Sequence, residues 1–240
     1  MKKYTLTLIL ALASLGLYAQ TNRNKTIINA ALHGWEYEIK AGVNLGGTAP
    51  LPFPEEIRSI DGYNPTLSIT IEGNMTKWLD TKKKWGIITG LRLENKGMRT
   101  KATVKNYNME IIGYDGNRLK GNWTGGVRTK VQNSYITIPV LAAYKLSPRT
   151  TLKLGPYFSY LMDGDFSGHV YEGYLRETNP TGDKINFTNG AIATYDFSGD
   201  LRKFQWGVQA GVDWKAFKHL KVHADLNWGL NDIFNKDFKT

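Results

Sequence analysis

Apolar and polar side chains alternate along this chain in seven separate runs. In the first run, Trp35, Tyr37 and Ile39 fall on one face of an extended chain, whereas Glu36 and Glu38 fall on the other. This period of two predicts β-strands with one apolar face. Each run is close to the roughly 9–11 residues with which a tilted strand crosses a bilayer. The predicted strands are residues 35–46, 65–77, 85–96, 134–146, 151–161, 204–215 and 220–230.

The connections between these strands are alternately long and short. Residues 80–84, 147–149 and 216–219 form short turns, whereas 47–64, 97–133 and 162–203 are far longer than ordinary hairpin loops. Outer-membrane barrels have this rhythm, because brief periplasmic turns and extended extracellular loops join their strands. We therefore predict an all-β fold, an antiparallel up-and-down transmembrane β-barrel with long extracellular loops at these three places.

Alternation alone also fits a soluble barrel whose apolar face points inward. Two features favour the membrane. Glycine is frequent on the polar face, where it leaves room for long charged side chains inside a narrow barrel. Aromatic residues of the apolar face collect near both strand ends, as in interfacial girdles. They are Trp35, Trp85, Tyr144 and Trp214 near the short turns, and Tyr160, Phe204, Trp206 and Trp228 near the long loops.

The odd number of strands predicts that one is missing. Single-chain bacterial barrels have an even number, and residues 231–240 contain no closing alternating run. Without an eighth strand, the first and seventh keep unpaired backbone groups at membrane depth, each costing several kcal/mol. We expect a barrel of the eight-stranded type with seven strands visible, in a chain that is incomplete at its C-terminus. Closure by a partner or by a loop segment is the alternative.

Two local signals modify this picture. Tyr114-Asp115-Gly116-Asn117 is a hairpin-turn signal inside the second long connection. It predicts a projecting ribbon in which residues 99–112 return as 118–132. Pro139 forfeits a ladder hydrogen bond within the fourth run, which predicts a bulge or kink there.

The N-terminus predicts export. Lys2 and Lys3 precede an apolar stretch at residues 6–17, and Ala19 stands before Gln20. These features describe a cleaved signal peptide over residues 1–19, with an N-terminal membrane anchor as the alternative. Residues 20–34 are then a short periplasmic segment, helical over 24–33, and residues 35–240 are the barrel. The absence of cysteine excludes disulfides and thiolate metal sites.

The net charge of +10 at pH 7 would permit nucleic-acid binding. An exported chain does not meet nucleic acid, so anionic lipid headgroups and acidic surface glycans are better partners. We expect the protein to reside in the outer membrane of a Gram-negative bacterium, in contact with outer-membrane lipid.

Five short motifs follow one another along the strands: Ala41-Gly42-Val43-Asn44-Leu45, Tyr135-Ile136-Thr137-Ile138-Pro139-Val140, Gly155-Pro156-Tyr157-Phe158, Gln205-Trp206-Gly207-Val208-Gln209-Ala210-Gly211 and Trp228-Gly229-Leu230-Asn231-Asp232-Ile233. In this order, from about Trp35 to Ile233, the chain resembles the PorT-like outer-membrane β-barrel proteins. The resemblance implies an eight-stranded barrel without catalytic residues, and the absent last strand departs from it. The family's founding members are accessory parts of a protein-secretion system, whereas most relatives have no assigned activity.

The polar strand faces predict an ion-pair network inside the barrel. Eight strands leave an interior filled by side chains, and buried charges need partners. His223 and Asp225 could serve a hydrolase, but no serine stands in register as a nucleophile. Asp163-Gly164-Asp165 lacks the ligand run of a calcium loop. We therefore predict no catalytic, cofactor or metal residues. The candidate lumenal network is Glu36, Glu38, Lys40, Glu72, Arg92, Glu94, Lys153, Asp213, Lys221, His223 and Asp225.

The second long connection is basic and the third is acidic, so we expect them to pack together over the barrel mouth. They would display Trp123, Tyr171 and Tyr174 to a partner. The leading hypothesis is a non-enzymatic outer-membrane protein whose loops bind a partner or ligand outside. The alternatives are an accessory component of secretion or envelope assembly and an outer-membrane lipid- or peptide-modifying enzyme. A diffusion pore is disfavoured, because the lumen is narrow and crowded.

Overall fold

The computed structural model describes residues 34–47, 55–113 and 116–235. The predicted signal peptide and the predicted helix at 24–33 lie outside these residues. In the described part of the chain, no helix is long and apolar enough to cross a membrane. The elements are β1 (Trp35–Asn44), β2 (Ile57–Thr66), β3 (Ser68–Trp78), β4 (Trp85–Ile112), β5 (Arg118–Lys145), β6 (Thr150–Glu177), β7 (Lys184–Asp196), the 3-10 helix η1 (Ser198–Asp200), β8 (Phe204–Phe217) and β9 (Leu220–Gly229).

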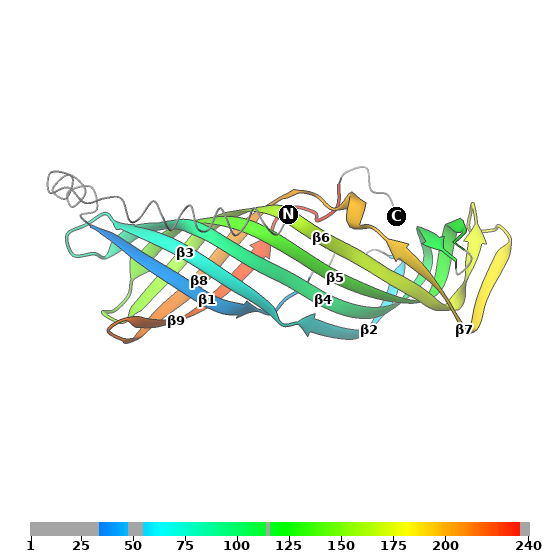
Figure 1. Ribbon diagram of the computed structural model, residues 1–240, viewed down its shortest axis with the longest axis horizontal. Helices are drawn as coiled ribbons and strands as arrows, with labels where there is room; N and C mark the ends of the chain where they lie inside the picture. The colour runs from blue at the N-terminus through cyan, green and yellow to red at the C-terminus, as the bar shows by residue number, and fades with distance from the viewer. Residues whose placement is uncertain (1–33, 48–54, 114–115, 236–240) are drawn as a thin grey trace, which may run out of the picture. The chain divides into compact units, whose positions relative to one another are not determined.

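The strands form one sheet that follows the order β1-β3-β4-β5-β6-β8-β9 (Figure 1). Every pair from β3 to β9 along this path is antiparallel. β2 pairs with β4 beside β3, and β7 pairs with both β6 and β4. The seven predicted strands correspond to the seven strands of this path, and the all-β, antiparallel, up-and-down barrel type is confirmed.

The path ends at β1 and β9, whose inward side chains meet. Lys221 Nζ lies 2.9 Å from Glu38 Oε2, and the imidazole of His223 lies next to Gly42. Both strands advance together through these contacts, so they run in the same direction, as the arrows in Figure 1 show. Among the described residues no ladder joins β1 to β9, and the path between them contains seven strands.

Apolar side chains on the barrel strands point outward and polar ones point inward. Ile39 and Leu226 are 85% and 69% exposed, whereas Thr137 and Gln209 are fully buried. A water-soluble barrel has the opposite arrangement. The outward alternation predicted from the sequence is therefore present in the structure.

Three strands are far longer than a membrane is thick. β4, β5 and β6 each contain 28 residues. At about 3.3 Å per residue such a strand measures about 92 Å, against a hydrocarbon core of about 30 Å. One half of each strand therefore belongs to the barrel and the other half projects beyond it. We call the projecting half the distal section (β2, residues 97–112, 118–133 and 163–177, and β7) and the remainder the barrel section.

The ribbon predicted in the second long connection is confirmed, because β4 and β5 stay paired from Arg99–Lys130 to Ile112–Arg118. The loop predicted at 162–203 is wrong, since β6 continues to Glu177 and β7 follows; likewise β2 occupies part of 47–64. Register shifts beside Ser134 and Tyr171 break the period of two, which hides these strands. Of the bulge or kink predicted at Pro139, the bulge is wrong, because the register is the same on both sides of it.

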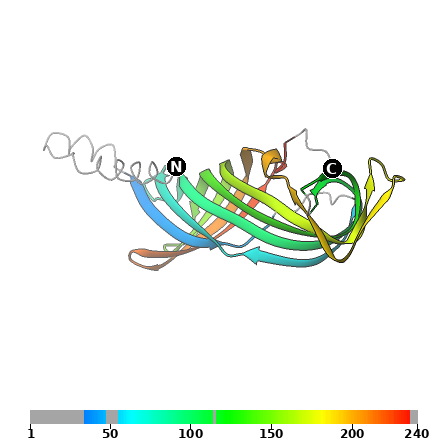
Figure 2. The same cartoon turned by 45° about the vertical axis from the view of Figure 1, so that its right-hand side comes forward.

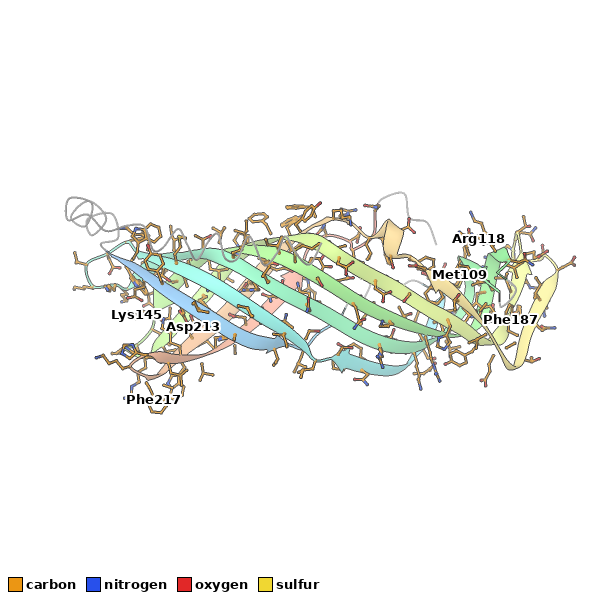
Figure 3. All side chains as sticks on the ribbon, viewed as in Figure 1. Met109, Arg118, Lys145, Phe187, Asp213 and Phe217 are labelled. Atoms are coloured by element: carbon orange, nitrogen blue, oxygen red, sulfur yellow. The ribbon has the colours of Figure 1, made fainter. Side chains whose placement is uncertain are left out.

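The distal section, in which the sheet curls over (Figure 2), has an apolar core of its own that includes Met109 and Phe187 (Figure 3). Its strands close on themselves, because β4 pairs with β5, β5 with β6, β6 with β7, and β7 again with β4. The prediction that Trp123 is exposed is wrong: it is fully buried, with its ring 5.3 Å from that of Phe187. The core consists of Val104, Met109, Ile111, Trp123, Val127, Val170, Leu175, Phe187, Ala193 and Tyr195.

Two glycines make room for Trp123. Gly125 adopts a φ of +151°, and a Cβ at Gly173 would lie 2.7 Å from Cζ2 of the indole. Any larger residue at Gly173 would displace the ring or the strand. The bulges that interrupt the sequence pattern therefore allow an indole to fill the closed end of this sheet.

We predict that Trp123→Ala destabilises the distal section by about 3–5 kcal/mol, because it leaves a large cavity in a dry core. Amide hydrogen exchange should accelerate over 118–133 and 163–177 and stay unchanged over 204–217. Tyr174→Ala, at a half-buried position outside this core, is the control. Equal exchange in Trp123→Ala and wild type would show that the distal section does not depend on this core.

Candidate functional site

A network of buried ion pairs fills the lumen of the barrel section. Lys153 Nζ lies 2.6 Å from Asp213 Oδ1 and 2.8 Å from Asp225 Oδ1. Lys40 Nζ lies 3.4 Å from the same Asp213 oxygen and 4.0 Å from Glu72. These side chains come from β1, β3, β6, β8 and β9, so the network ties together strands that are distant in the sequence.

Arg92 on β4 continues the network. Its Nε pairs with Glu72, and its Nη2 donates to Gln209 Oε1 at 2.9 Å. Its Nη1 lies 3.8 Å from Glu94 Oε2. Lys96 Nζ lies 3.1 Å from Glu94. The network therefore contains four cations (Lys40, Arg92, Lys96, Lys153) and four carboxylates (Glu72, Glu94, Asp213, Asp225), which balance.

Lys96 was predicted to belong to the basic second connection and was not included in the predicted lumenal network. Its even-numbered place on β4, in step with Arg92 and Glu94, is the signal that identifies it as inward-facing. Thr137 and Ser159 were also missed. The Thr137 hydroxyl donates to Glu94 at 2.8 Å and lies 2.7 Å from the Ser159 hydroxyl, and both residues are almost fully buried.

The remaining predicted residues lie outside this balanced group. Glu38 and Lys221 pair with each other, and both are partly exposed. Glu36 lies on β1 and is half-buried. The His223 imidazole packs against Gly42, whereas the Asp225 carboxylate is held by Lys153. Asp225 therefore takes part in the ion-pair network, and among the described residues no hydrogen bond joins it to His223.

An apolar cluster occupies the lumen near the short turns. Trp78, Ile88, Leu141 and Ala143 pack together, and Lys145 Nζ lies 4.4 Å from the centroid of the Trp78 ring. This cluster explains why both faces of the fourth predicted strand are apolar: one faces lipid and the other faces Trp78. Ion pairs and this cluster therefore both occupy the lumen of the barrel section.

The outer face of the distal section combines aromatic rings with cations. Arg128 lies 5.1 Å from the centroid of the Tyr171 ring, and Lys184 lies 4.5 Å from that of Tyr174. Both tyrosines are half-buried. A hydrogen bond with Thr124 and then the nearby cations lower the pKa of Tyr174. Residues of the basic and acidic connections lie side by side, and Lys130 pairs with Asp165 at 3.2 Å.

In the described residues no group of three or more His, Cys, Asp and Glu side chains is placed to hold a metal ion. The family model described as an outer membrane protein beta-barrel domain matches residues 18–235. Comparisons with curated proteins and with solved structures found no match.

We predict that Arg92→Met destabilises the barrel by about 3–5 kcal/mol, because Glu72 loses its closest partner while buried. Arg118→Met is the matched control, since Arg118 pairs with Glu110 at an exposed site and should cost less than about 1 kcal/mol. The stability of both variants is measured by thermal and urea unfolding, followed on a gel as the loss of the heat-modifiable folded band. Equal unfolding midpoints in the two variants would show that the lumenal network does not stabilise the barrel.

Proposed function

Since the chain belongs to the outer membrane protein β-barrel domain family and is an integral outer-membrane protein, we propose that it binds a partner through its distal section outside the cell. The observation that carries this proposal is the distal section itself. It is a closed sheet with its own core, and spanning a bilayer requires none of it. Loops and edges on a rigid scaffold are where binding residues concentrate.

The direction in which the distal section projects supports its placement outside the cell, which we call the proposed orientation. The connections β3–β4, β5–β6 and β8–β9 are short and lie at the end of the barrel section away from the distal section. The first is held by Asp80, whose carboxylate accepts hydrogen bonds from the backbone of Lys84 and Trp85 at 2.8 Å each. In bacterial outer-membrane barrels such short turns face the periplasm. The distal section then faces the exterior.

The lumen supports a binding function over transport or catalysis. Its charged groups are engaged in ion pairs and its apolar cluster surrounds Trp78. We therefore propose that the protein is not an enzyme and has no cofactor. Tyr174, Arg176 and Lys184 provide a better contact surface, because aromatic rings and cations are enriched where proteins bind partners.

The resemblance to PorT-like proteins supports a narrower second proposal, an accessory role in secretion or envelope assembly. Three of the motifs that carry it lie on β5, β6 and β8, and the other two cover the ends of β1 and β9 with the residues that follow. All five are in the barrel section. Under this proposal the protein should co-purify with other envelope proteins through its barrel section. Deletion of β7 would then leave that association intact.

The proposed orientation is tested with single cysteines, because the chain has none of its own. We predict that Thr188→Cys on β7 reacts with a membrane-impermeant maleimide in intact cells. Lys218→Cys in the β8–β9 turn should react only after the outer membrane is permeabilised. The reverse pattern would place the distal section in the periplasm and overturn the proposal.

We predict that Tyr174→Ser/Arg176→Gln/Lys184→Gln weakens capture of the surface partner by purified protein at least tenfold, because it removes the ring and both cations. Each captured component should be identified and its dissociation constant measured. Lys82→Gln/Lys215→Gln/Lys218→Gln, at the short turns, is the control and should bind normally. Undiminished binding by the Tyr174 variant would exclude this surface.

A further inference from the structure

The outward face shared by β4 and β5 changes from apolar to cationic without a break in register. Each pair on this face consists of residues directly opposite each other, and no register shift separates one pair from the next. All of them therefore project in the direction of the lipid-facing side chains. In order away from the barrel section, three of these pairs are Leu93–Ile136, Arg99–Lys130 and Lys101–Arg128.

The four cations Arg99, Lys101, Arg128 and Lys130, which we call the cationic patch, repel one another. Like charges directly opposite on neighbouring strands are destabilising, and here two such pairs are adjacent. Lys130 is offset by Asp165. Within residues 34–47, 55–113 and 116–235, no carboxylate forms an ion pair with the other three. The fold therefore bears an unfavourable concentration of charge that an anion would relieve.

The surroundings of the patch offset only part of its charge. Asp61 on β2 is ionised at neutral pH, because hydrogen bonds from the Ser59 and Thr103 hydroxyls hold its pKa below the ordinary value, but among the described residues it forms no ion pair with a cation of the patch. His169 stands opposite Arg128. Partial burial and then Arg128 lower the pKa of His169, so its imidazole is neutral at pH 7. The positive charge of the patch at neutral pH comes from the four permanent cations.

The height of the patch above the apolar face of the barrel section indicates which chemical groups lie opposite it. Arg99 lies six residues beyond Leu93 on β4. At about 3.3 Å per residue and a tilt near 45°, this places Arg99 about 14 Å above the last outward apolar residue of the strand. The patch points sideways, over the neighbouring leaflet. An ordinary headgroup region is only about 5–8 Å thick, so the patch lies above phospholipid phosphates and at a height that only a large glycolipid headgroup reaches. The acyl chains of such a lipid would lie against Leu91, Leu93 and Ile138, which are exposed.

We infer that the cationic patch binds the phosphate groups of an outer-leaflet glycolipid, whose acyl chains pack on the apolar face below it. This inference rests on the proposed orientation of the distal section. Phosphate suits the patch because guanidinium groups bind it with two parallel hydrogen bonds and lysine binds it as a point charge.

The test uses the purified, folded protein in detergent, with lipopolysaccharide that retains a phosphorylated core as the probe. We expect Arg99→Gln/Lys101→Gln/Arg128→Gln/Lys130→Gln to bind it at least tenfold more weakly than wild type. The salt dependence of binding should also decrease, because fewer ionic contacts are screened. Lipopolysaccharide from which the phosphates have been removed should bind wild type as weakly as the intact probe binds the variant.

A matched control removes four cations from the opposite end. Lys82→Gln/Arg149→Gln/Lys215→Gln/Lys218→Gln should bind the intact probe like wild type. Both variants should show the heat-modifiable folded band, since the patch substitutions remove repulsion. Lys101→Gln alone, expected to weaken binding about twofold to fivefold, keeps the test decisive if the fourfold variant does not fold.

Equal binding by wild type and the patch variant would overturn the inference, as would equal binding of the intact and dephosphorylated probes. The measurement is made in detergent, so it does not depend on which way the protein is inserted. If the lipopolysaccharide test fails but Thr188→Cys is labelled on intact cells, the proposed function still holds. If Lys218→Cys is labelled on intact cells and Thr188→Cys is not, the proposed function is overturned, whatever the binding result.

Discussion

The hydrocarbon core of a membrane offers no water to a polar group, and the rest of this structure follows from that constraint. The polar side chains of the barrel section must find one another, so Arg92, Lys153 and their carboxylate partners meet in the lumen. Beyond the membrane this constraint no longer applies, and on the same strands the inward residues become apolar and the outward residues become polar. On β4, the inward series Arg92, Glu94 and Lys96 gives way to Met98 and then Val104. The outward series changes from Leu93 to Arg99 and Lys101 within the same few residues.

This inversion decides what could be predicted from the sequence. The strands of the barrel section have a regular period of two, and their inward residues could be identified by parity alone. Most of the lumenal network was therefore predicted, although its pairing was not, because partners such as Lys40 and Asp213 are far apart in the chain. Lys96 was missed because it lies where the polar face of the barrel section ends.

The distal section was harder to predict for a physical reason. Register shifts beside Ser134, Val104 and Tyr171 reverse the parity of a strand partway along it. After such a shift, alternation no longer separates inward from outward residues. The extra residues at these shifts do not lie on β5, where Trp123 stays in step with the inward residues Val131 and Tyr135. Trp123 was taken for an exposed aromatic residue because the second connection was expected to have no core of its own, although it belongs to a packed core. The glycines that admit its ring, Gly125 and Gly173, resemble ordinary loop residues in the sequence.

The barrel section and the distal section differ in what their side chains contact. Ion pairs and the Trp78 cluster fill the barrel section, which makes it an anchor. The distal section extends three of the same strands outward and presents charged and aromatic side chains on a rigid surface. Continuous strands connect the two sections, so the position of the distal surface above the bilayer is set by the depth of the barrel.

The central claim is that apolar side chains of the barrel face acyl chains while polar ones fill the lumen, and adjacent residues on one strand test it most directly. Leu226 and Asn227 on β9 point to opposite faces: Leu226 is 69% exposed and Asn227 is half-buried. Each is replaced by a single cysteine carrying a fluorophore, in protein inserted into vesicles with brominated acyl chains. The account predicts strong quenching at position 226 and little at 227. Equal quenching at both positions, or stronger quenching at 227, would contradict it.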